Sequence, residues 1–438
     1  MTGAARPGRA PDTGRAAATE AAGAPAAVAA GGAPAWRPGR DFRAMWADLG
    51  PIGRDAAGGY RRFAWTAVDA QLRDWFRAEA AARGLTYEVD RNGNQWAWLG
   101  DPARGDAVVT GSHLDSVPGG GAFDGPLGVV SAFAALDELR ARGARPRRPL
   151  GVVAFSDEEG ARFGVACVGS RLACGLLDPE RARALRDPEG VTLAAAMERA
   201  GHDPAGIGPD PERLTRIGAF VECHIEQGRG LVDLGRPVGV GSVIWPHGRW
   251  RFDFAGEANH AGTTRLADRR DPMLTYAHTV LAARKRARLA GALATFGRVA
   301  VEPNGVNAVP SLVSGWLDSR AADADTLAEL VAGIERTAAE RGTRDGVDVT
   351  VTRESHTAAV AFDARLRDRA ATLLGGAPVL PTGAGHDAGI LSDAVPTAML
   401  YVRNPTGVSH APAEHADESD CRAGIAALTD VLEDLVCP

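Results

Sequence analysis

The chain has 438 residues, with 49 Lys and Arg against 55 Asp and Glu and a formal net charge of −6 when histidine is neutral. This length predicts two or three domains, and the charge excludes the strongly basic surface by which proteins hold nucleic acid or anionic lipid. The single lysine, Lys285, lies among arginines, which disfavours a P-loop or a Schiff-base site. The five cysteines form no Cys-x-x-Cys pair, which predicts a reduced protein. No apolar run is long enough to span a membrane, so we expect a cytoplasmic protein.

Residues 1–40 are almost entirely Ala, Gly, Pro, Arg and Thr, so we expect a disordered tail that buries too little surface to offset the entropy of ordering. The following segments have the apolar periodicity of helices and strands, and Asn92-Gly93 predicts a hairpin turn between two of them. The predicted elements are a helix over 61–82, strands over 86–90, 95–99 and 107–110, a helix over 127–142 and a strand over 150–155. The succession of strand, helix and strand predicts a parallel α/β sheet.

A second unit begins near Gly248 and has a different order of elements. Its predicted elements are a strand over 250–254, a helix over 272–289, strands over 295–301 and 312–318, a helix over 326–341 and a strand over 347–352. The order βαββαβ predicts a small two-layer domain. The last elements, a helix over 363–374, a strand over 398–402 and a helix over 418–436, are expected to rejoin the first sheet.

The predicted fold class is therefore α/β, with a smaller domain inserted into a larger one. The larger domain covers 41–247 and 356–438 and holds a mixed, largely parallel sheet flanked by helices, and the inserted domain covers 248–355.

Residues with ligand chemistry directly follow the predicted strand at 107–110. His113 could bind a metal while Asp115 orients its ring, since metal-bound imidazoles usually donate their other N–H to a carboxylate. Asp124 lies in the glycine-rich loop 119–125, which is flexible enough for the carboxylate to face His113. A hydrogen-bonded structural histidine and an ordinary turn are the alternatives, and neither motif decides between them alone.

Three acids, Asp157, Glu158 and Glu159, follow the next predicted strand, at the sheet edge where open α/β folds bind ligands. Because side chains alternate along a strand, neighbouring carboxylates can take different tasks, one as a metal ligand and one as a base. The segments 222–228 and 407–415 add histidines beside further acids or an amide. Each segment alone is compatible with a polar turn, but their recurrence after successive apolar elements predicts a metal site.

Competing motifs are weaker. The segment 383–388 matches G-x-G-x-x-A, but it has no plain βαβ unit around it and no ribose-binding acid at the usual distance, so we reject a dinucleotide site. The absence of G-x-S-x-G and His-Glu-x-x-His from the sequence removes the commonest serine-hydrolase and zincin interpretations.

Taken together, the motifs resemble the amidase branch of the dinuclear metallopeptidase and aminoacylase superfamily. That branch contains allantoate amidohydrolases, N-carbamoyl-L-amino acid hydrolases and β-ureidopropionases. The resemblance covers about residues 42–438, with the motifs in the family's order and at comparable spacing. The segments that carry it are 111–115, 119–128, 157–164, 222–228, 256–264, 303–320 and 409–414.

The resemblance implies two divalent metal ions per subunit, Mn²⁺ or Zn²⁺, with Co²⁺ or Ni²⁺ as alternatives. Asp124 would bridge the two ions, with His113 and His224 completing one site and Glu159 and His410 completing the other. The Asp124–Gly125 peptide matches one that is cis in the family. The implied catalytic residues are Glu158 as general base, Asp115, which orients His113, and His260, which reaches the partner subunit's active site to stabilise an oxyanion.

The resemblance also implies substrate contacts. Asn307 and Arg320 would hold a substrate carboxylate, for which the planar fork of arginine is suited, and Gln227 and Gly385 would make further contacts. The sequence departs from the family pattern at Arg265, where a proline is common, and at Gly315-Trp316. These departures affect the expected lid packing and leave the metal ligands unchanged.

The implied function is hydrolysis of the ureido C–N bond of a small anionic ureido carboxylate, by a homodimer that associates through the lid domain over 248–355. Allantoate is the favoured substrate, and N-carbamoyl-L-amino acids or β-ureidopropionate remain alternatives because the residues named do not separate them. An aminopeptidase or deacylase is disfavoured by His224, where peptidase relatives use an acid. A non-catalytic scaffold is disfavoured because every ligand and Glu158 are present.

Overall fold

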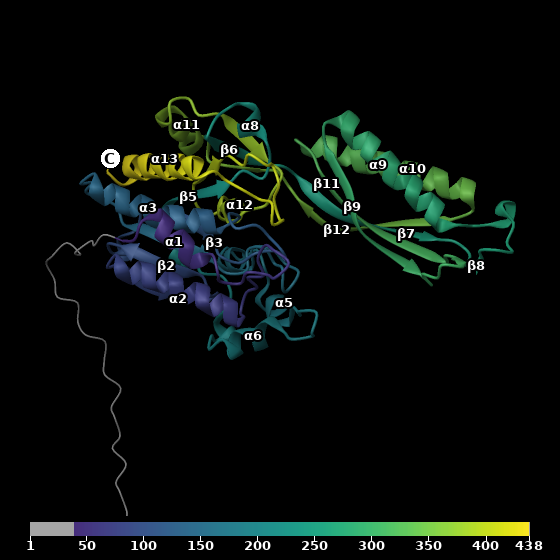
Figure 1. Ribbon diagram of the computed structural model, residues 1–438, viewed down its shortest axis with the longest axis horizontal. Helices are drawn as coiled ribbons and strands as arrows, with labels where there is room; N and C mark the ends of the chain where they lie inside the picture. Colours follow the sequence, from purple (N-terminus) through teal and green to yellow (C-terminus); the bar gives the residue numbers. More distant parts are fainter. Residues whose placement is uncertain (1–38, 438) are drawn as a thin grey trace, which may run out of the picture. The chain divides into compact units, whose positions relative to one another are not determined.

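The computed structural model describes residues 39–437, so the predicted disordered tail lies outside the described residues except at its last two positions. Most of the described chain forms one large mixed sheet with helices on both faces, and a separate four-stranded sheet carries two long helices (Figure 1). This arrangement confirms the predicted α/β class. None of the helices in residues 39–437 combines the length and the apolar character that a membrane span requires.

The large sheet has the strand order β1-β2-β4-β3-β5-β15-β6-β13, and β14 pairs with β6. Its strands are β1 Thr86–Val89, β2 Gln95–Leu99, β3 Ala107–His113, β4 Leu150–Phe155, β5 Ile217–Ile225, β6 Val238–Ile244, β13 Val360–Ala361, β14 Val379–Thr382 and β15 Thr397–Val402. The four central strands, β4, β3, β5 and β15, run parallel. Their carboxyl ends therefore lie at one edge of the sheet.

Two hydrophobic layers cover the faces of this sheet, because successive side chains of a strand point to opposite sides. Val108 and Val152 pack with the core under α3 and α13, whereas their neighbours Val109 and Val153 pack with Leu391 of α12. The helices of this part are α1 Phe42–Leu49, α2 Ala67–Ala82, α3 Pro126–Ala141, α4 Val168–Ala173, α5 Pro179–Ala184, α6 Leu193–Arg199, α7 Pro211–Leu214, α8 Gly230–Asp233, α11 Ala364–Leu373, α12 Asp387–Leu391 and α13 Glu418–Val436, with 3₁₀ turns at Pro102–Arg104 and Pro204–Gly206.

The smaller sheet is antiparallel and has the order β12-β7-β11-β9. Its strands are β7 His247–Ala255, β9 Leu293–Glu302, β11 Leu312–Arg320 and β12 Asp348–Thr357. Its helices, α9 Pro272–Ala290 and α10 Ala324–Asp345, bury one face of the sheet in a core that includes Phe252, Phe254 and Ile334. A short ladder of β8 Asn259–His260 with β10 Ala308–Val309, and a 3₁₀ turn at Leu266–Asp268, complete this part.

Most predicted elements are found within a few residues of their expected ends, including the hairpin of β1 and β2. The helix predicted over 61–82 begins only at Ala67, because the Thr66 side chain accepts the backbone N–H of Asp69 and caps it there. Strands β5 and β6 and the short helices between 168 and 214 were not predicted. The expected cis peptide at Asp124–Gly125 is wrong, since the cis bond in the described residues is Glu302–Pro303.

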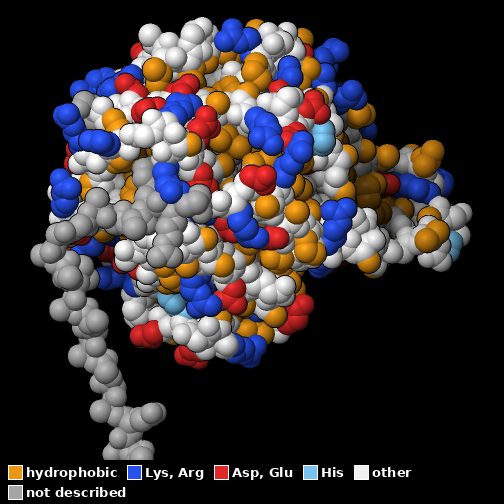
Figure 2. Space-filling view, turned by 60° about the vertical axis from the view of Figure 1, so that its left-hand side comes forward, with side chains coloured by type: hydrophobic (Ala, Val, Ile, Leu, Met, Phe, Trp, Pro, Cys, Tyr) orange, Lys and Arg blue, Asp and Glu red, His pale blue; other side chains and the backbone are white. Residues whose placement is uncertain are grey.

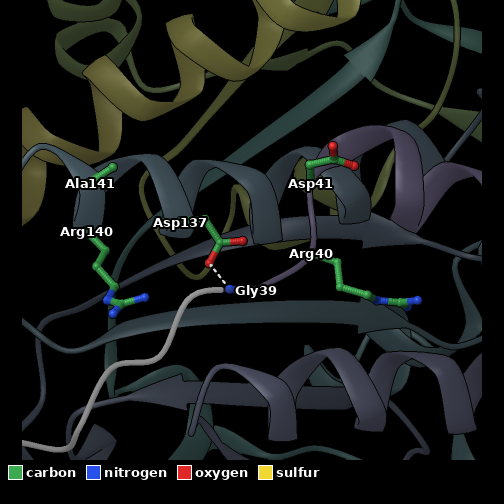
Figure 3. A pocket seen from close by; sticks show the side chains of 6 residues that line it. All are labelled: Gly39, Arg40, Asp41, Asp137, Arg140 and Ala141. Carbon is green, nitrogen blue, oxygen red and sulfur yellow. Dashed lines mark hydrogen bonds between the residues drawn. The ribbon is translucent and has the colours of Figure 1, made fainter.

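Charged side chains are interspersed in sign on the face drawn in Figure 2, but one group of them is buried. Arg83 is fully buried and donates to Glu79 Oε2 at 2.6 Å and to Asp137 Oδ2 at 2.6 Å. Arg40 pairs with the same Glu79, and Gly39 N donates to Asp137 Oδ1 at 3.0 Å (Figure 3). This network ties the segment before α1 to α2 and α3.

Removing Glu79 would leave the buried Arg83 without one of its two carboxylate partners. We expect Glu79→Ala to lower the free energy of unfolding by about 3–5 kcal/mol, measured by urea denaturation. The matched control is Glu418→Ala, which breaks an exposed pair with Arg43 and is expected to cost less than about 1 kcal/mol. Equal effects of the two substitutions would contradict the structural importance of the buried network.

Candidate metal and substrate site

All five predicted metal ligands meet at the carboxyl edge of the four central parallel strands. His113 is the last residue of β3, Glu159 follows β4, His224 lies near the end of β5, and His410 follows β15. Asp124 lies in the loop between β3 and α3. The parallel registers bring these strand ends together, with His113 beside Phe155 of β4 and His224 beside Tyr401 of β15.

The carboxylate of Asp124 is the centre of this group. Its Oδ1 lies 3.4 Å from His113 Nε2 and 3.2 Å from His224 Nε2. Its Oδ2 lies 3.2 Å from His410 Nε2, which is 3.6 Å from Glu159 Oε2. Among the described residues, three groups of ligand atoms have the spacing needed to hold a metal ion, and two of them, His113/Asp124/His224 and Asp124/Glu159/His410, share Asp124. We call the five residues of these two sets the Asp124 group. The third group, Glu222/His224/His386, shares His224 with it.

The hydrogen bonds of the two buried imidazoles fit a cation at this place. His113 Nδ1 lies 3.2 Å from the carbonyl oxygen of Asp115, and His224 Nδ1 lies 2.8 Å from that of Ile225. A carbonyl only accepts hydrogen bonds, so both Nδ1 atoms carry a proton, and in the neutral form of each ring, which is the form that binds a metal, Nε2 presents a lone pair toward Asp124. Among residues 39–437, neither buried Nε2 atom has a hydrogen-bond partner. Lone pairs that converge on a carboxylate need a positive charge between them, as a divalent metal supplies.

The electrostatics of the acids support the same interpretation. Burial would raise the pKa of Asp124, but the facing imidazoles of His113, His224 and His410 lower it well below its usual value. Burial raises the pKa of Glu158 well above its usual value, and nearby acids add to the shift. Burial and the charge of Asp124 raise the pKa of Glu159 to about 7. The site thus crowds carboxylates whose ionisation a bound cation would favour.

Glu158 is buried beside the shared carboxylate and is held from several sides. Its Oε2 lies 3.7 Å from His113 Nε2, and its Oε1 accepts a hydrogen bond from Cys167 Sγ at 3.3 Å. Asp115 accepts the backbone N–H of Glu158 at 3.2 Å and that of Glu159 at 3.0 Å. Asp115 therefore fixes the acidic turn after β4 as well as lying next to the His113 ring.

Glu414 is a site residue to which the sequence analysis gave no role. Its Oε1 accepts the backbone N–H groups of Phe123 and Asp124, each at 2.9 Å, and it is 4% exposed. A side chain at Gly121 would collide with Glu414, and one at Gly125 would collide with the His113 ring. Glycine at these two positions lets the loop pass between the ring and the carboxylate.

Gln227, predicted to contact substrate, donates to Asp124 Oδ2 at 2.8 Å and to Ser409 Oγ at 3.0 Å. The segment 383–388, for which we rejected a dinucleotide site, also contributes to the metal site. The ring of its buried His386 lies 4.5 Å from the ring of His224, measured between ring centroids. Burial lowers the pKa of His386 well below its usual value. Gly385, beside it, is exposed, and no atom lies within 4 Å of the position of a side chain there.

The remaining predicted residues come from the smaller sheet and its ladder. Arg320 donates to the Gly383 carbonyl and, through Nε, to Asp318 Oδ1 at 2.9 Å. His260 and Asn307 lie together, since Ala261 N donates to the Asn307 carbonyl at 2.9 Å, and both side chains are exposed. Within residues 39–437, neither makes a hydrogen bond to the Asp124 group.

Some of these contacts left a signal in the sequence. Glu414 lies four residues after His410 in the segment 409–414, so a role in the same site could have been inferred from the sequence. Nothing in the local pattern indicates that Cys167, eight residues after Glu159 in an irregular loop, contacts Glu158. His386 was hidden by a glycine pattern that resembles a different type of site.

Comparison with known proteins identifies relatives that span nearly the whole chain. The N-carbamoyl-L-amino acid amidohydrolase of Geobacillus stearothermophilus is 37% identical over 387 residues, which cover 86% of this chain and 93% of the relative. The allantoate amidohydrolase of Escherichia coli (strain K12) is 32% identical over 396 residues, which cover 88% and 95%. The crystal structure of an amidase of the hydantoinase/carbamoylase family from Burkholderia multivorans superposes with a TM-score of 0.80 at 30% identity, covering 91% of this chain and 99% of that chain.

The family described as Peptidase family M20/M25/M40 matches residues 109–434, a span that includes every residue of the Asp124 group. The relatives are named as enzymes that act on C–N bonds, and both substrate types of the implied amidase branch occur among them. The chain therefore belongs to Peptidase family M20/M25/M40 and is an amidohydrolase of its allantoate and N-carbamoyl amino acid group.

Proposed function

We propose that the protein hydrolyses the ureido C–N bond of allantoate, releasing ammonia, carbon dioxide and ureidoglycine. The observation that carries the proposal is the pair of ligand sets that share Asp124, with the buried Glu158 beside them. The Escherichia coli relative named allantoate amidohydrolase supports this substrate. The 37% identity to a relative named for N-carbamoyl-L-amino acids supports those compounds as the second candidate substrates.

Two divalent ions fit the two ligand sets. His113, Asp124 and His224 would hold one ion, and Asp124, Glu159 and His410 would hold the other. The imidazole and carboxylate donors suit Mn²⁺ or Zn²⁺, and also Co²⁺ or Ni²⁺. The chemistry that such ions supply when bound is Lewis-acid catalysis, which favours the ionisation of water and polarises a carbonyl group.

Glu158 is the proposed general base. Its carboxylate takes a proton from the attacking water and returns that proton to the leaving nitrogen of the ureido group. The hydrogen bond from Cys167 and the Asp115 contacts to the backbone hold the side chain in one orientation. This orientation lets a single carboxylate receive and deliver the proton without a large movement.

Arg320 is proposed to bind the substrate carboxylate, with Asn307, Gln227 and Gly385 as further contacts. Asp318 accepts from Nε and Nη2 of Arg320 and fixes the plane of the guanidinium group, whose remaining N–H groups on Nη1 and Nη2 would bind the substrate carboxylate. A neutral urea lacks that carboxylate and should be a poor substrate. The Arg320 contact to Gly383 lies three residues from His386, which packs on His224.

A homodimer through the small-sheet part, 248–355, is proposed to complete the site with His260 from the partner subunit. Strand β9 is at the edge of its sheet, and Leu274, Leu281 and Leu289 lie exposed along α9 at a spacing of two helical turns. Exposed apolar residues gathered on one element mark a surface that another protein covers. His260 would then stabilise the negative charge that develops on the substrate oxygen.

We further propose that the protein works in the cytoplasm and binds neither nucleic acid nor membrane. All five cysteines are free, which suits a reducing compartment. The net charge of −6 offers no general attraction for phosphate backbones.

The function is tested by ammonia release from allantoate and from a panel of N-carbamoyl-L-amino acids with Mn²⁺-loaded protein. We expect a higher kcat/KM for allantoate, and we expect Glu158→Gln to lower kcat at least about 100-fold because the proton acceptor is lost. Bound metal, measured in the same samples, should be unchanged. No ammonia from any ureido acid would refute the proposed reaction, and full turnover by Glu158→Gln would refute the role of this residue.

The contact of Glu414 with the Asp124 loop predicts a role in metal retention. Glu414→Ala removes the acceptor of two buried N–H groups and should weaken metal binding about 10–100-fold, measured as metal content after dialysis against graded chelator. Glu414→Gln keeps an acceptor oxygen and should lie between the wild type and Glu414→Ala. The exposed Glu418→Ala serves as the control, and an equal loss there would contradict the specific effect.

Catalysis across the dimer is tested by mixing two inactive variants. Glu158→Gln and His260→Ala homodimers should each be nearly inactive, whereas co-expressed chains should recover up to about a quarter of wild-type activity. This recovery is expected because half of randomly formed dimers are mixed and each holds one complete site. No recovery from proteins shown to exchange subunits would place His260 in its own chain's site.

A further inference from the structure

His247 is the first residue of β7, and it lies directly opposite Arg320 of β11 in the antiparallel pair. Thr357 of β12 lies opposite His247 on its other side. Directly paired residues point to the same face of a sheet, with Cβ atoms about 5 Å apart. His247 therefore stands next to the guanidinium group to which we assign the substrate carboxylate.

The chain just before β7 contacts the segment that leads to His386. Trp245 N donates to the Thr382 carbonyl at 2.9 Å, and Arg320 donates to the Gly383 carbonyl. Three residues later, His386 packs on the ring of His224. The segment 382–386 therefore links the strand ends that carry His247 and Arg320 to the ring that packs on His224.

The hydrogen bond of His247 decides what its free nitrogen can recognise. Nδ1 lies 3.0 Å from the carbonyl oxygen of Trp245, which only accepts, so Nδ1 carries the proton. Burial lowers the pKa of His247, and the positive charges of Arg320 and Arg249 lower it further. The Trp245 carbonyl and Asp318 act in the opposite direction but do not reverse the shift, so the ring is neutral at pH 7. Nε2 is then a pure acceptor, and it has no hydrogen-bond partner within residues 39–437.

We propose that His247 is a specificity-determining residue, which selects ureido carboxylates that carry a second N–H or O–H donor, besides the ureido group that is cleaved, on the carbon bearing the carboxylate. The proposal rests on the proposed function. The lone pair of Nε2 repels a carboxylate, which stays with Arg320, and it accepts a hydrogen bond from the neighbouring donor. Allantoate offers such a donor in its second ureido group.

An apolar group at the same place would be rejected. It would cover Nε2 without offering a hydrogen, so that the acceptor loses its contact with water and gains nothing. Sites built around a hydrogen bond discriminate strongly against a substrate that lacks the matching group. N-carbamoyl-L-alanine, which has a methyl group in place of the second ureido group, should therefore be disfavoured relative to allantoate.

The experiment compares kcat and KM for allantoate, N-carbamoyl-L-alanine and N-carbamoylglycine in wild-type, His247→Leu and His247→Gln proteins. In the wild type we expect allantoate to be preferred. His247→Leu should lower kcat/KM for allantoate about tenfold, mainly through KM because His247 does not touch the scissile bond, and should leave or improve the value for N-carbamoyl-L-alanine. His247→Gln keeps an acceptor oxygen and should retain most of the preference.

His356→Leu is the matched control. This exposed histidine pairs with Gly248, one position away from the pair of Thr357 and His247, so its side chain lies on the other face of the sheet. It should leave the preference unchanged. An equal loss for all three substrates in His247→Leu, or a wild-type preference for N-carbamoyl-L-alanine, would overturn the role of His247 while leaving the reaction class intact. No hydrolysis of any of the three compounds by the wild type would overturn the proposed function itself.

Discussion

The site depends on one buried carboxylate, that of Asp124, at which three imidazoles converge. A buried charge is costly unless oppositely charged or hydrogen-bonding groups surround it, and Asp124 obtains them from three separate parts of the chain. His113 and His224 face one oxygen, and His410 and Gln227 face the other. The loop that carries Asp124 is fixed in turn by Glu414. The parallel strands of the large sheet can be understood as the frame that brings these parts together.

The metal end and the substrate end of the site are built differently. The metal end consists of side chains at the ends of parallel strands, where backbone hydrogen bonds of the sheet fix each position. The proposed substrate end consists of Arg320 and His247 on paired antiparallel strands. Changes at the second sheet can therefore alter which molecule is held without disturbing the ligands at the first. This separation fits a family whose relatives are named for different substrates.

The sequence predicted the large sheet well because its central strands are apolar and its helices are amphipathic. It missed β5 as an element, since Glu222 and His224 interrupt the apolar pattern at the place where the strand enters the site. The five metal-ligand candidates were predicted from their residue types and from a family resemblance, and the structure brings them together. Contacts made through the backbone, such as those of Asp115 with the turn after β4, depend on loop geometry that no local pattern encodes.

The contact between Asp124 and Glu414 joins residues that are 290 positions apart. A growing chain on the ribosome cannot make this contact, or place His410 beside Asp124, until nearly the whole protein has been synthesised. Closing such long-range contacts is slow, and larger chains reach them through partly folded intermediates. Completion of the second ligand set is consequently a late event in the biogenesis of this protein, and a chain interrupted before residue 410 would hold the residues of one set but not all those of the other.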